Sequence, residues 1–279
     1  MKVSVIIPSF NRAYCVSTAI DSVLSQTVAN QSDELELIVV DDGSTDESRS
    51  LIEQNYPEVI YLHQANQGVS AARNLGLARA TGDWIALLDS DDEWLPNKLE
   101  TQFELLDTTG LKVCHTEEIW IRNGVRVNQM NKHKKSGGEI FENCLPLCAM
   151  SPSSIVIHRS VFDEIGIFDE SLPACEDYDL WLRLTARYQV AFVQEPLIKK
   201  IGGHDDQLSR QHWGMDRFRV IALDKVLTQN AEFLNDAQAS AAKTMLIKKL
   251  TILLNGAVKH NNADLIADCE QRLAKWAPA

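Results

Sequence analysis

Residues 82–92 read GDWIALLDSDD, an apolar run that ends abruptly in acidic side chains. A continuous run of this kind predicts a strand that is buried on both faces, as in a parallel sheet. Asp89 and Asp91 lie two residues apart at the strand end, where the repulsion between their carboxylates calls for a cation. Mg²⁺ or Mn²⁺ suits such a pair, because these ions complete their shell with phosphate and water. The alternative is a turn in which Asp92 caps a helix that begins near Pro96.

Two strands predicted upstream end in polar clusters in the same way. Residues 3–7 lead into the cluster PSFNR, and residues 35–40 lead into the cluster DDGS. Apolar residues at helical spacing lie between the strands, which predicts an α/β fold with a Rossmann-like, mixed but mainly parallel sheet flanked by helices. Ligands of such sheets bind outside the carboxyl ends of the strands. We therefore expect the three polar clusters to meet at one edge.

Several local signals predict where individual elements begin. Ser44 and Glu47 have the spacing of a capping box, which predicts a helix that starts at Ser44. Asn123-Gly124 between two apolar runs predicts a β-hairpin with a type I′ turn. Residues 128–138 are polar and basic, which indicates a mobile surface loop.

The pattern of strands and helices changes twice along the chain. After residue 107 the regular alternation stops, and from Trp213 onward the apolar spacing is helical to the end. We therefore expect three parts, residues 1–107, 108–211 and 212–279, of which the last is a C-terminal helical extension.

Composition and charge exclude several classes of protein. The chain has 279 residues, with 27 Lys and Arg against 39 Asp and Glu, a net charge of −12. Such a field repels phosphates, which disfavours binding to nucleic acid. No apolar run approaches the ~20 residues that a membrane-spanning helix needs. The six cysteines lack the spacing of a zinc site or a disulfide framework, so free thiols in a reducing cytoplasm are expected.

Further residues are candidates for chemistry, each with a plainer alternative. One carboxylate of Asp41-Asp42 could accept hydrogen bonds from a nucleoside, or the pair could belong to an acidic turn. One carboxylate among Glu176, Asp177 and Asp179 could be a general base, or these acids could favour the start of a helix through the helix dipole. His204 lies in a glycine turn and is either structural or close to a metal or phosphate. Arg73 could serve a phosphate or an acidic site, or it could be solvated on a helix.

The phosphate-binding loops of other nucleotide enzymes are missing from the sequence. No G-x-G-x-x-G follows the first strand, and the chain contains no G-x-x-x-x-G-K-[ST]. Dinucleotide-dependent dehydrogenases and P-loop NTPases are therefore disfavoured. If a diphosphate binds, a metal on Asp91 is its natural counter-charge.

Four segments together resemble the family-two nucleotide-sugar glycosyltransferases of the GT-A fold. The resemblance extends over residues 3–183, and its segments are VSVIIPSFNR, IVVDDGSTDES, NQGVSAARNLGLARATGDWIALLDSDD and ACEDYDLWLRL. It implies that residues 1–107 form the nucleotide-sugar-binding half of a GT-A domain and that residues 108–211 form its acceptor and catalytic half. It fades through residues 122–150 and is nearly absent after residue 215.

The resemblance also implies roles for individual residues. Asp177 matches the catalytic base. Asp91 and His204 match groups that reach the metal, which would be Mn²⁺ or Mg²⁺. The residues that would bind the nucleotide sugar are Pro8, Phe10, Asn11, Arg12, Asp42, Gly68, Arg73, Asp89 and Ser90.

The implied activity is the metal-dependent, inverting transfer of one sugar from a nucleoside-diphosphate sugar to an acceptor hydroxyl in cell-surface polysaccharide or glycoconjugate synthesis. A UDP-sugar is the favoured donor, and a glycan or lipid-linked molecule is the expected acceptor. We expect a cytoplasmic protein. The sequence leaves open whether it associates with the inner face of the membrane and whether it forms a homodimer through the C-terminal helices. The rival functions are a nucleotidyltransferase that makes sugar nucleotides and a non-catalytic nucleotide- or carbohydrate-binding module.

Overall fold

The computed structural model describes residues 2–27, 35–203 and 212–276, and within these ranges nine strands form one sheet. The strand order is β3-β2-β1-β4-β8-β6-β9-β5, and β7 pairs with β6. The strands are β1 (Val3–Ser9), β2 (Leu35–Asp41), β3 (Ile60–His63), β4 (Trp84–Leu87), β5 (Glu93–Trp94), β6 (Val113–Arg122), β7 (Val125–Val127), β8 (Val156–His158) and β9 (Ala191–Gly202). Strands β1 to β4 are parallel to one another, and β8 runs antiparallel to β4. The predicted α/β fold with a mixed sheet is confirmed.

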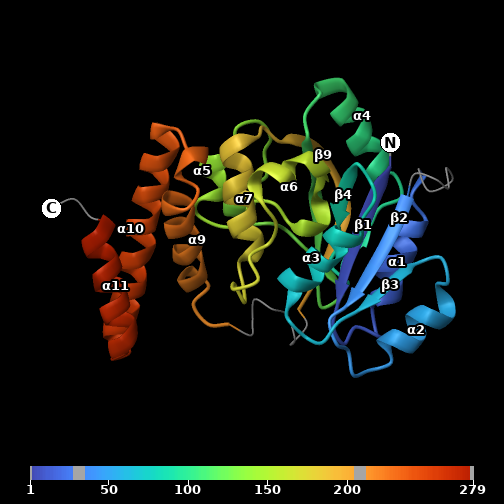
Figure 1. The fold of residues 1–279 in the computed structure, drawn as a ribbon, viewed down its shortest axis with the longest axis horizontal. Helices are drawn as coiled ribbons and strands as arrows, with labels where there is room; N and C mark the ends of the chain where they lie inside the picture. Colours follow the sequence, from blue (N-terminus) through green and yellow to red (C-terminus); the bar gives the residue numbers. More distant parts are fainter. Residues whose placement is uncertain (1, 28–34, 204–211, 277–279) are drawn as a thin grey trace.

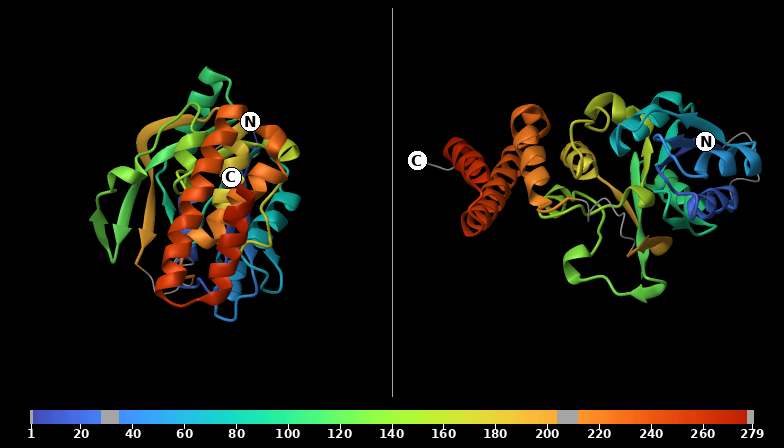
Figure 2. Two further views of the ribbon diagram at one scale, coloured as in Figure 1. Left: turned by 90° about the vertical axis from the view of Figure 1, so that its left-hand side faces the viewer. Right: turned by 90° about the horizontal axis from the view of Figure 1, so that it is seen from below.

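Helices flank this sheet, and three more extend the molecule at its C-terminal end (Figure 1). The helices of four or more residues are α1 (Val16–Leu24), α2 (Ser48–Asn55), α3 (Val69–Arg79), α4 (Lys98–Thr109), α5 (Phe141–Cys144), α6 (Arg159–Ile165), α7 (Glu176–Arg187), α9 (Asp216–Thr228), α10 (Asp236–Lys259) and α11 (Ala263–Trp276). Figure 2 shows α9, α10 and α11 side by side beyond α7, as the predicted helical extension requires. None of the helices that the structure describes is both long and apolar enough to cross a membrane.

The alternation of side chains along β1 explains why helices cover both faces. Val5 and Ile7 point into the core that α1 shares, whereas Ile6 points into the core that α3 and α7 share. Successive side chains of a strand face opposite sides, so an apolar run without polar alternation needs cover on both. This is the physical basis of the three-layer arrangement.

The carboxyl ends of the parallel strands lie at one edge, as predicted. Ser9, the last residue of β1, is in register with Asp41, the last residue of β2, and the Asp42 N–H donates to the Ser9 carbonyl at 2.8 Å. On the other side of β1, Ile6 is in register with Leu87 at the end of β4. The polar clusters that follow these strands are therefore neighbours.

Two local predictions differ from the structure. The helix predicted to start at Ser44 is α2, which begins at Ser48. The Ser44 hydroxyl instead accepts a hydrogen bond from the Asn11 N–H at 2.8 Å, so it joins two strand-end loops, and Asp46 accepts the Ser48 N–H at 3.0 Å. The apolar runs at residues 190–193 and 197–201 predict two short strands, whereas the structure has one, because β9 crosses an irregularity in its pairing with β6 and continues.

The predicted hairpin is present in the structure, whereas the basic loop that follows it is not exposed throughout. β6 and β7 form the predicted antiparallel hairpin, with positive φ angles of 50° at Asn123 and 75° at Gly124, as a type I′ turn requires. The prediction that residues 128–138 form a surface loop is wrong for Lys135. Its ammonium group is buried and pairs with the Glu118 carboxylate at 2.8 Å.

Gly76 places α3 directly against β1, and this contact can be tested. A Cβ atom built at Gly76 would overlap Cγ2 of Ile6, a β-branched side chain held in a buried strand. We expect Gly76→Ala to lower the free energy of unfolding by about 1–3 kcal/mol, measured by urea denaturation. Gly256→Ala in α10 is the matched control, because nothing lies within 4 Å of its added Cβ. That control should gain ~0.5–1 kcal/mol from helix propensity, and equal effects of the two variants would contradict the packing argument.

Candidate active site

The loop after β2 is organised by two adjacent carboxylates with different roles. Asp41 is fully buried and accepts hydrogen bonds from the Tyr61 hydroxyl at 2.5 Å and the Ser44 N–H at 2.7 Å. Burial, together with the Asp41 carboxylate, raises the pKa of Tyr61, which keeps the phenol a donor. Asp41 is therefore part of the framework, a role that the sequence did not distinguish from that of its neighbour.

Asp42 ties the second strand end to the start of α3. Its Oδ1 accepts from the Gln67 N–H at 2.9 Å and the Gln64 amide at 2.7 Å, and its Oδ2 accepts from the Gly68 N–H at 2.8 Å. Gly68 precedes α3 with a φ of 90°. A carboxylate offers about four acceptor positions, so Asp42 retains capacity for a further donor such as a nucleobase N–H.

The segment after β1 presents aromatic and amide groups at the same edge. Asn11 has a left-handed φ of 53°, and its side-chain oxygen accepts the Thr45 N–H at 2.8 Å. The Arg12 N–H donates to the Ser48 hydroxyl at 3.0 Å. Pro8 is buried within β1, whereas Phe10 is 43% exposed. The loop is thus fixed by the DDGS turn while the Phe10 ring stays accessible.

Arg73 connects the end of β4 to the start of α7. Its Nη2 lies 2.8 Å from Oδ1 of Asp89, and its Nη1 lies 2.6 Å from Oε1 of Glu176. The side chain is 3% exposed, and its Cζ lies 5.2 Å from the centroid of the Phe168 ring. Although burial opposes its charge, the two carboxylates raise the pKa of Arg73, so the guanidinium is a permanent cation. The alternative of a solvated helix residue is excluded.

The four residues DSDD divide into buried and accessible members. Asp92 is buried and accepts from the Ser153 hydroxyl at 2.6 Å and the Ile201 N–H at 2.9 Å, so it joins this turn to β9. Burial raises the pKa of Asp92 well above its ordinary value. Asn97, not Asp92, is the N-cap residue of α4, so the capping alternative is wrong. Ser90 is buried as well, whereas Asp89 and Asp91 are partly exposed.

Asp89 and Asp91 are the groups that could hold a divalent cation. Their carboxylate oxygens are hard ligands of the kind that Mg²⁺ and Mn²⁺ take, and both reach the surface at the strand edge. Among residues 2–27, 35–203 and 212–276, no three His, Cys, Asp or Glu side chains are grouped as a complete metal site. The donor set therefore fits an ion that draws its other ligands from phosphate and water. His204, predicted as a further metal residue, lies outside the described residues.

Asp177 is the second residue of α7 and is partly exposed, unlike Glu176 before it. Its Oδ1 accepts the Tyr178 N–H at 2.6 Å, and its Oδ2 lies 2.9 Å from the thiol sulfur of Cys148. Cys148 was missed by sequence reasoning, because 29 residues separate it from Asp177 and no motif relates the two. A partly exposed carboxylate held by two donors can accept a proton from a bound hydroxyl.

The other acidic groups near the start of α7 are engaged in packing. Asp179 is buried and pairs with Arg183 at 2.8 Å and Lys225 at 3.1 Å. Burial and the charge of Asp177 raise the pKa of Glu176, an effect that the Arg73 guanidinium opposes. Of the three acids at this helix start, Asp177 is the one that the structure leaves accessible.

The predicted residues therefore form a connected arrangement around the first turns of α3. Gly68 binds Asp42, and Arg73, five residues further on, binds both Asp89 and Glu176. Asp177 follows Glu176 directly in the chain. The nucleotide-side and acceptor-side residues of the prediction are thus linked by direct contacts at one edge of the sheet.

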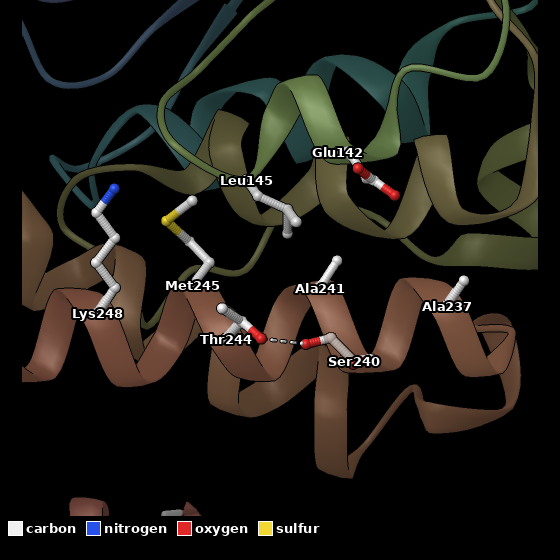
Figure 3. A pocket seen from close by; sticks show the side chains of 8 residues that line it. All are labelled: Glu142, Leu145, Ala237, Ser240, Ala241, Thr244, Met245 and Lys248. Atoms are coloured by element: carbon white, nitrogen blue, oxygen red, sulfur yellow. Dashed lines mark hydrogen bonds between the residues drawn. The ribbon is translucent and has the colours of Figure 1, made fainter.

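A groove lies elsewhere, between α5 and α10, and contains none of the predicted site residues. Figure 3 shows Leu145 facing Ala241 and Met245 across it. Its volume is about 560 Å³, and the complete lining is Glu142, Leu145, Ala237, Ser240, Ala241, Thr244, Met245 and Lys248.

Comparison with known proteins identifies similar chains. The sequence model of glycosyl transferase family 2 matches residues 4–166, more than half of the chain. WfgD of Escherichia coli, named UDP-Glc:alpha-D-GlcNAc-diphosphoundecaprenol beta-1,3-glucosyltransferase, is 33% identical over 184 residues, which cover 65% of this chain and 69% of WfgD. An uncharacterized glycosyltransferase of Rickettsia bellii is 33% identical over 201 residues, which cover 71% of this chain and 28% of that protein. The chain therefore spans under a third of this larger relative.

Solved structures with the same fold include S. aureus TarS. The crystal structure of TarS 1-349 in complex with UDP-GlcNAc has a TM-score of 0.70 and 19% sequence identity, and the match covers 90% of this chain and 72% of that one. A second crystal structure of the same TarS segment, in complex with UDP, has a TM-score of 0.65 and 20% identity. At this level of identity the likeness concerns the fold, and it confirms the predicted GT-A architecture.

The bridge made by Arg73 predicts a pH-dependent loss of stability. Arg73→Met leaves the buried Glu176 carboxylate without its cation, which should cost about 3–5 kcal/mol of unfolding free energy at pH 8. The Glu176 pKa is already raised, and removing Arg73 raises it further. At pH values between the pKa of Glu176 in the unfolded chain and its higher pKa in the folded protein, the folded state holds a proton that the unfolded state has lost. The free energy of unfolding therefore falls as the pH rises through this range.

Urea denaturation of Arg73→Met at pH 5 and pH 8 checks this prediction. The free energy of unfolding of the variant should be closer to that of the unsubstituted protein at pH 5 than at pH 8. Adding Glu176→Gln should remove most of the pH dependence that Arg73→Met introduces, because the buried carboxylate that lost its cation is no longer there to titrate. A loss in Arg73→Met that is the same at both pH values would contradict a stranded Glu176 charge.

Proposed function

The chain belongs to glycosyl transferase family 2, and on that basis we propose that it transfers one sugar from a nucleoside-diphosphate sugar to an acceptor hydroxyl. The observation that carries the proposal is the Arg73 bridge, which ties Asp89 at the end of β4 to Glu176 beside Asp177. The bridge links Asp89, which would face the diphosphate, to Glu176, whose neighbour in the chain, Asp177, would face the acceptor. In this assignment residues 1–107 bind the donor, and residues 108–211 carry the catalytic base and bind the acceptor.

Asp177 is the proposed general base. Its carboxylate takes the proton of an acceptor hydroxyl, and the hydroxyl oxygen attacks the anomeric carbon on the face opposite the nucleoside diphosphate. The bond from the anomeric carbon to the diphosphate oxygen breaks, and the configuration at that carbon inverts. The partial exposure of Asp177, beside the buried Glu176, supports this role, because the base must reach a bound substrate.

The donor is held at the strand edge by the groups after β1, β2 and β4. Phe10 offers an accessible ring to the nucleobase, and Asp42 offers its remaining acceptor capacity to a base N–H. Asp89 and Asp91 are the residues that would hold Mn²⁺ or Mg²⁺. When bound, the ion supplies positive charge that neutralises the diphosphate leaving group. The remaining residues assigned to the donor site are Pro8, Asn11, Arg12, Gly68 and Ser90.

A UDP-sugar is the proposed donor and a lipid-linked glycan the proposed acceptor. TarS, which shares the fold, was crystallised in complex with UDP-GlcNAc, and the name of WfgD states a UDP-Glc donor and a diphosphoundecaprenol acceptor. Such an acceptor would bring the protein to the inner face of the membrane from the cytoplasm, for synthesis of a cell-surface glycan. Helices α9, α10 and α11 are the proposed surface for a homodimer.

The first test replaces the proposed base. Asp177→Asn should lower kcat by about 10²- to 10⁴-fold, because an amide cannot take the acceptor proton. The measurement is the release of UDP from UDP-glucose and UDP-GlcNAc with a synthetic GlcNAc-diphospholipid as acceptor. Binding of UDP, measured by calorimetry, should stay unchanged, because Asp177 does not face the nucleotide in this assignment. Undiminished turnover would remove Asp177 from the mechanism, and the absence of UDP release by the unsubstituted protein from any nucleotide sugar would favour the non-catalytic binding module.

The second test addresses the proposed metal residue. Asp91→Ala should weaken UDP binding in the presence of Mn²⁺ by about 10- to 100-fold. Removing a residue that only orients a metal ligand typically lowers metal affinity by this factor, and removing the ligand itself should cost at least as much. Calorimetry with Mn²⁺ and with EDTA separates the metal-dependent part of binding. Asp83→Ala is the matched control, because Asp83 is an exposed carboxylate at the opposite end of β4. Equal affinities for Asp91→Ala and Asp83→Ala would contradict a metal at Asp91.

A further inference from the structure

The segment from Leu145 to Met150, which follows α5, is held by side chains from three separate parts of the chain. Four of its backbone carbonyls each accept a hydrogen bond from a different side chain. The pairs are Leu145 with the Tyr178 hydroxyl at 2.7 Å, Pro146 with the Lys249 ammonium at 2.8 Å, Ala149 with the Lys135 ammonium at 3.2 Å and Met150 with the Trp181 indole at 3.0 Å. The segment has no helix or strand of its own, so these bonds determine its conformation.

Both ammonium groups that bind the segment are themselves buried and neutralised. Lys249 pairs with Asp216 of α9 at 2.9 Å, and Lys135 pairs with Glu118 of β6 at 2.8 Å. A buried lysine without an anion would be strongly disfavoured, so each ion pair keeps its lysine in place. The carbonyls of Pro146 and Ala149 are therefore bound by fixed cations on either side of residue 148.

This arrangement places the thiol of Cys148 against the carboxylate of Asp177. The sulfur lies 2.9 Å from Oδ2 of Asp177 and 3.0 Å from the Met150 carbonyl oxygen. A thiol has one hydrogen, so it can donate to one of these two acceptors at a time. The other carboxylate oxygen, Oδ1, is held by the Tyr178 N–H.

We propose that Cys148 is a positioning residue for Asp177, with its S–H group orienting the carboxylate toward the acceptor hydroxyl. The inference rests on the proposed role of Asp177 as general base and deepens it. Tyr178 N–H and Cys148 S–H hold one oxygen each, which fixes the rotation of the carboxylate about its bond to Cβ. The remaining lone pairs of Oδ2 are then left for the acceptor hydroxyl, since Asp177 is partly exposed.

The thiol hydrogen can follow the proton that Asp177 receives. While the carboxylate is charged, the S–H group donates to Oδ2. When Asp177 has taken the acceptor proton, rotation about the Cβ–Sγ bond turns the same hydrogen to the Met150 carbonyl, and no proton leaves the sulfur. Burial raises the pKa of Cys148 well above its ordinary value, and so does the charge of Asp177. The thiol therefore stays protonated throughout.

Other charged or titratable groups act on Cys148 as well. Lys200 of β9 lowers the pKa of its thiol, and Cys144 of α5 raises it, but both effects are smaller than those of burial and Asp177. The carboxylate is thus the main electrostatic partner of this sulfur.

The kinetic test compares Cys148→Ala with Cys148→Ser. Alanine removes the donor, whereas serine keeps a single hydroxyl donor at the same position. We expect alanine to lower kcat about tenfold and to move the acidic limb of the kcat–pH profile up by about one unit, because the charged carboxylate has lost a hydrogen bond. Serine should retain kcat within about threefold. UDP affinity, measured by calorimetry, should be the same in both variants.

A second measurement needs no acceptor. Alkylation of Cys148 by iodoacetamide, followed by mass spectrometry of its peptide across a pH series, reports the titration of the thiol. The midpoint for Cys148 should be lower in Asp177→Asn than in the unsubstituted protein, because the charge that opposes the thiolate is gone. The partly exposed Cys15 serves as an internal control, and its midpoint should not move.

Each outcome decides the proposal. A lower Cys148 midpoint in Asp177→Asn, together with a defect in alanine that serine rescues, supports it. An unchanged midpoint, an unchanged acidic limb in alanine or equal losses in alanine and serine would overturn it. If Asp177→Asn keeps full turnover while the Cys148 midpoint shifts, the contact is real and the proposed base is wrong, so the two failures are distinguishable.

Discussion

The architecture of the candidate site depends on one buried cation. Arg73 reaches from α3 to a carboxylate at the end of β4 and to another at the start of α7, elements that are far apart in the sequence. The two carboxylates contact the same guanidinium, and without it their negative charges would repel each other. Arginine suits this position because its planar fork donates in two directions and stays charged when buried. The contact of Gly76 with β1 fixes the helix that presents it.

The C-terminal helices support the same site from the opposite side. Lys249 of α10 pairs with Asp216 of α9 and also binds the Pro146 carbonyl, while Lys225 of α9 reaches Asp179 in α7. These contacts join the helical extension to the segment and the helix that surround Asp177. The extension is therefore a structural part of the proposed acceptor side, and the Lys225–Asp179 ion pair that joins it to α7 is largely buried.

Sequence reasoning succeeded where a local pattern has one geometric consequence. Apolar runs that end in polar clusters, such as the one before Asp89, predicted parallel strands with a common edge, and the Asn123-Gly124 turn predicted its hairpin. It failed where a polar residue had several partners to choose from. Ser44 was expected to cap a helix and instead binds the loop after β1, and Lys135 was expected on the surface and instead neutralises Glu118. Those choices depend on segments that the local pattern does not include.

The sequence by itself determined the class of fold, the edge of the sheet at which the acidic residues gather and the family to which the chain is similar. These follow from side-chain periodicity and from motifs in a fixed order, which are properties of the linear chain. Tertiary structure alone decided which carboxylates are accessible and which are framework, since Asp89 and Asp177 differ from Asp92 and Asp179 only in what packs around them. It also decided that Cys148 meets Asp177, because contacts across the fold bring that thiol to the carboxylate.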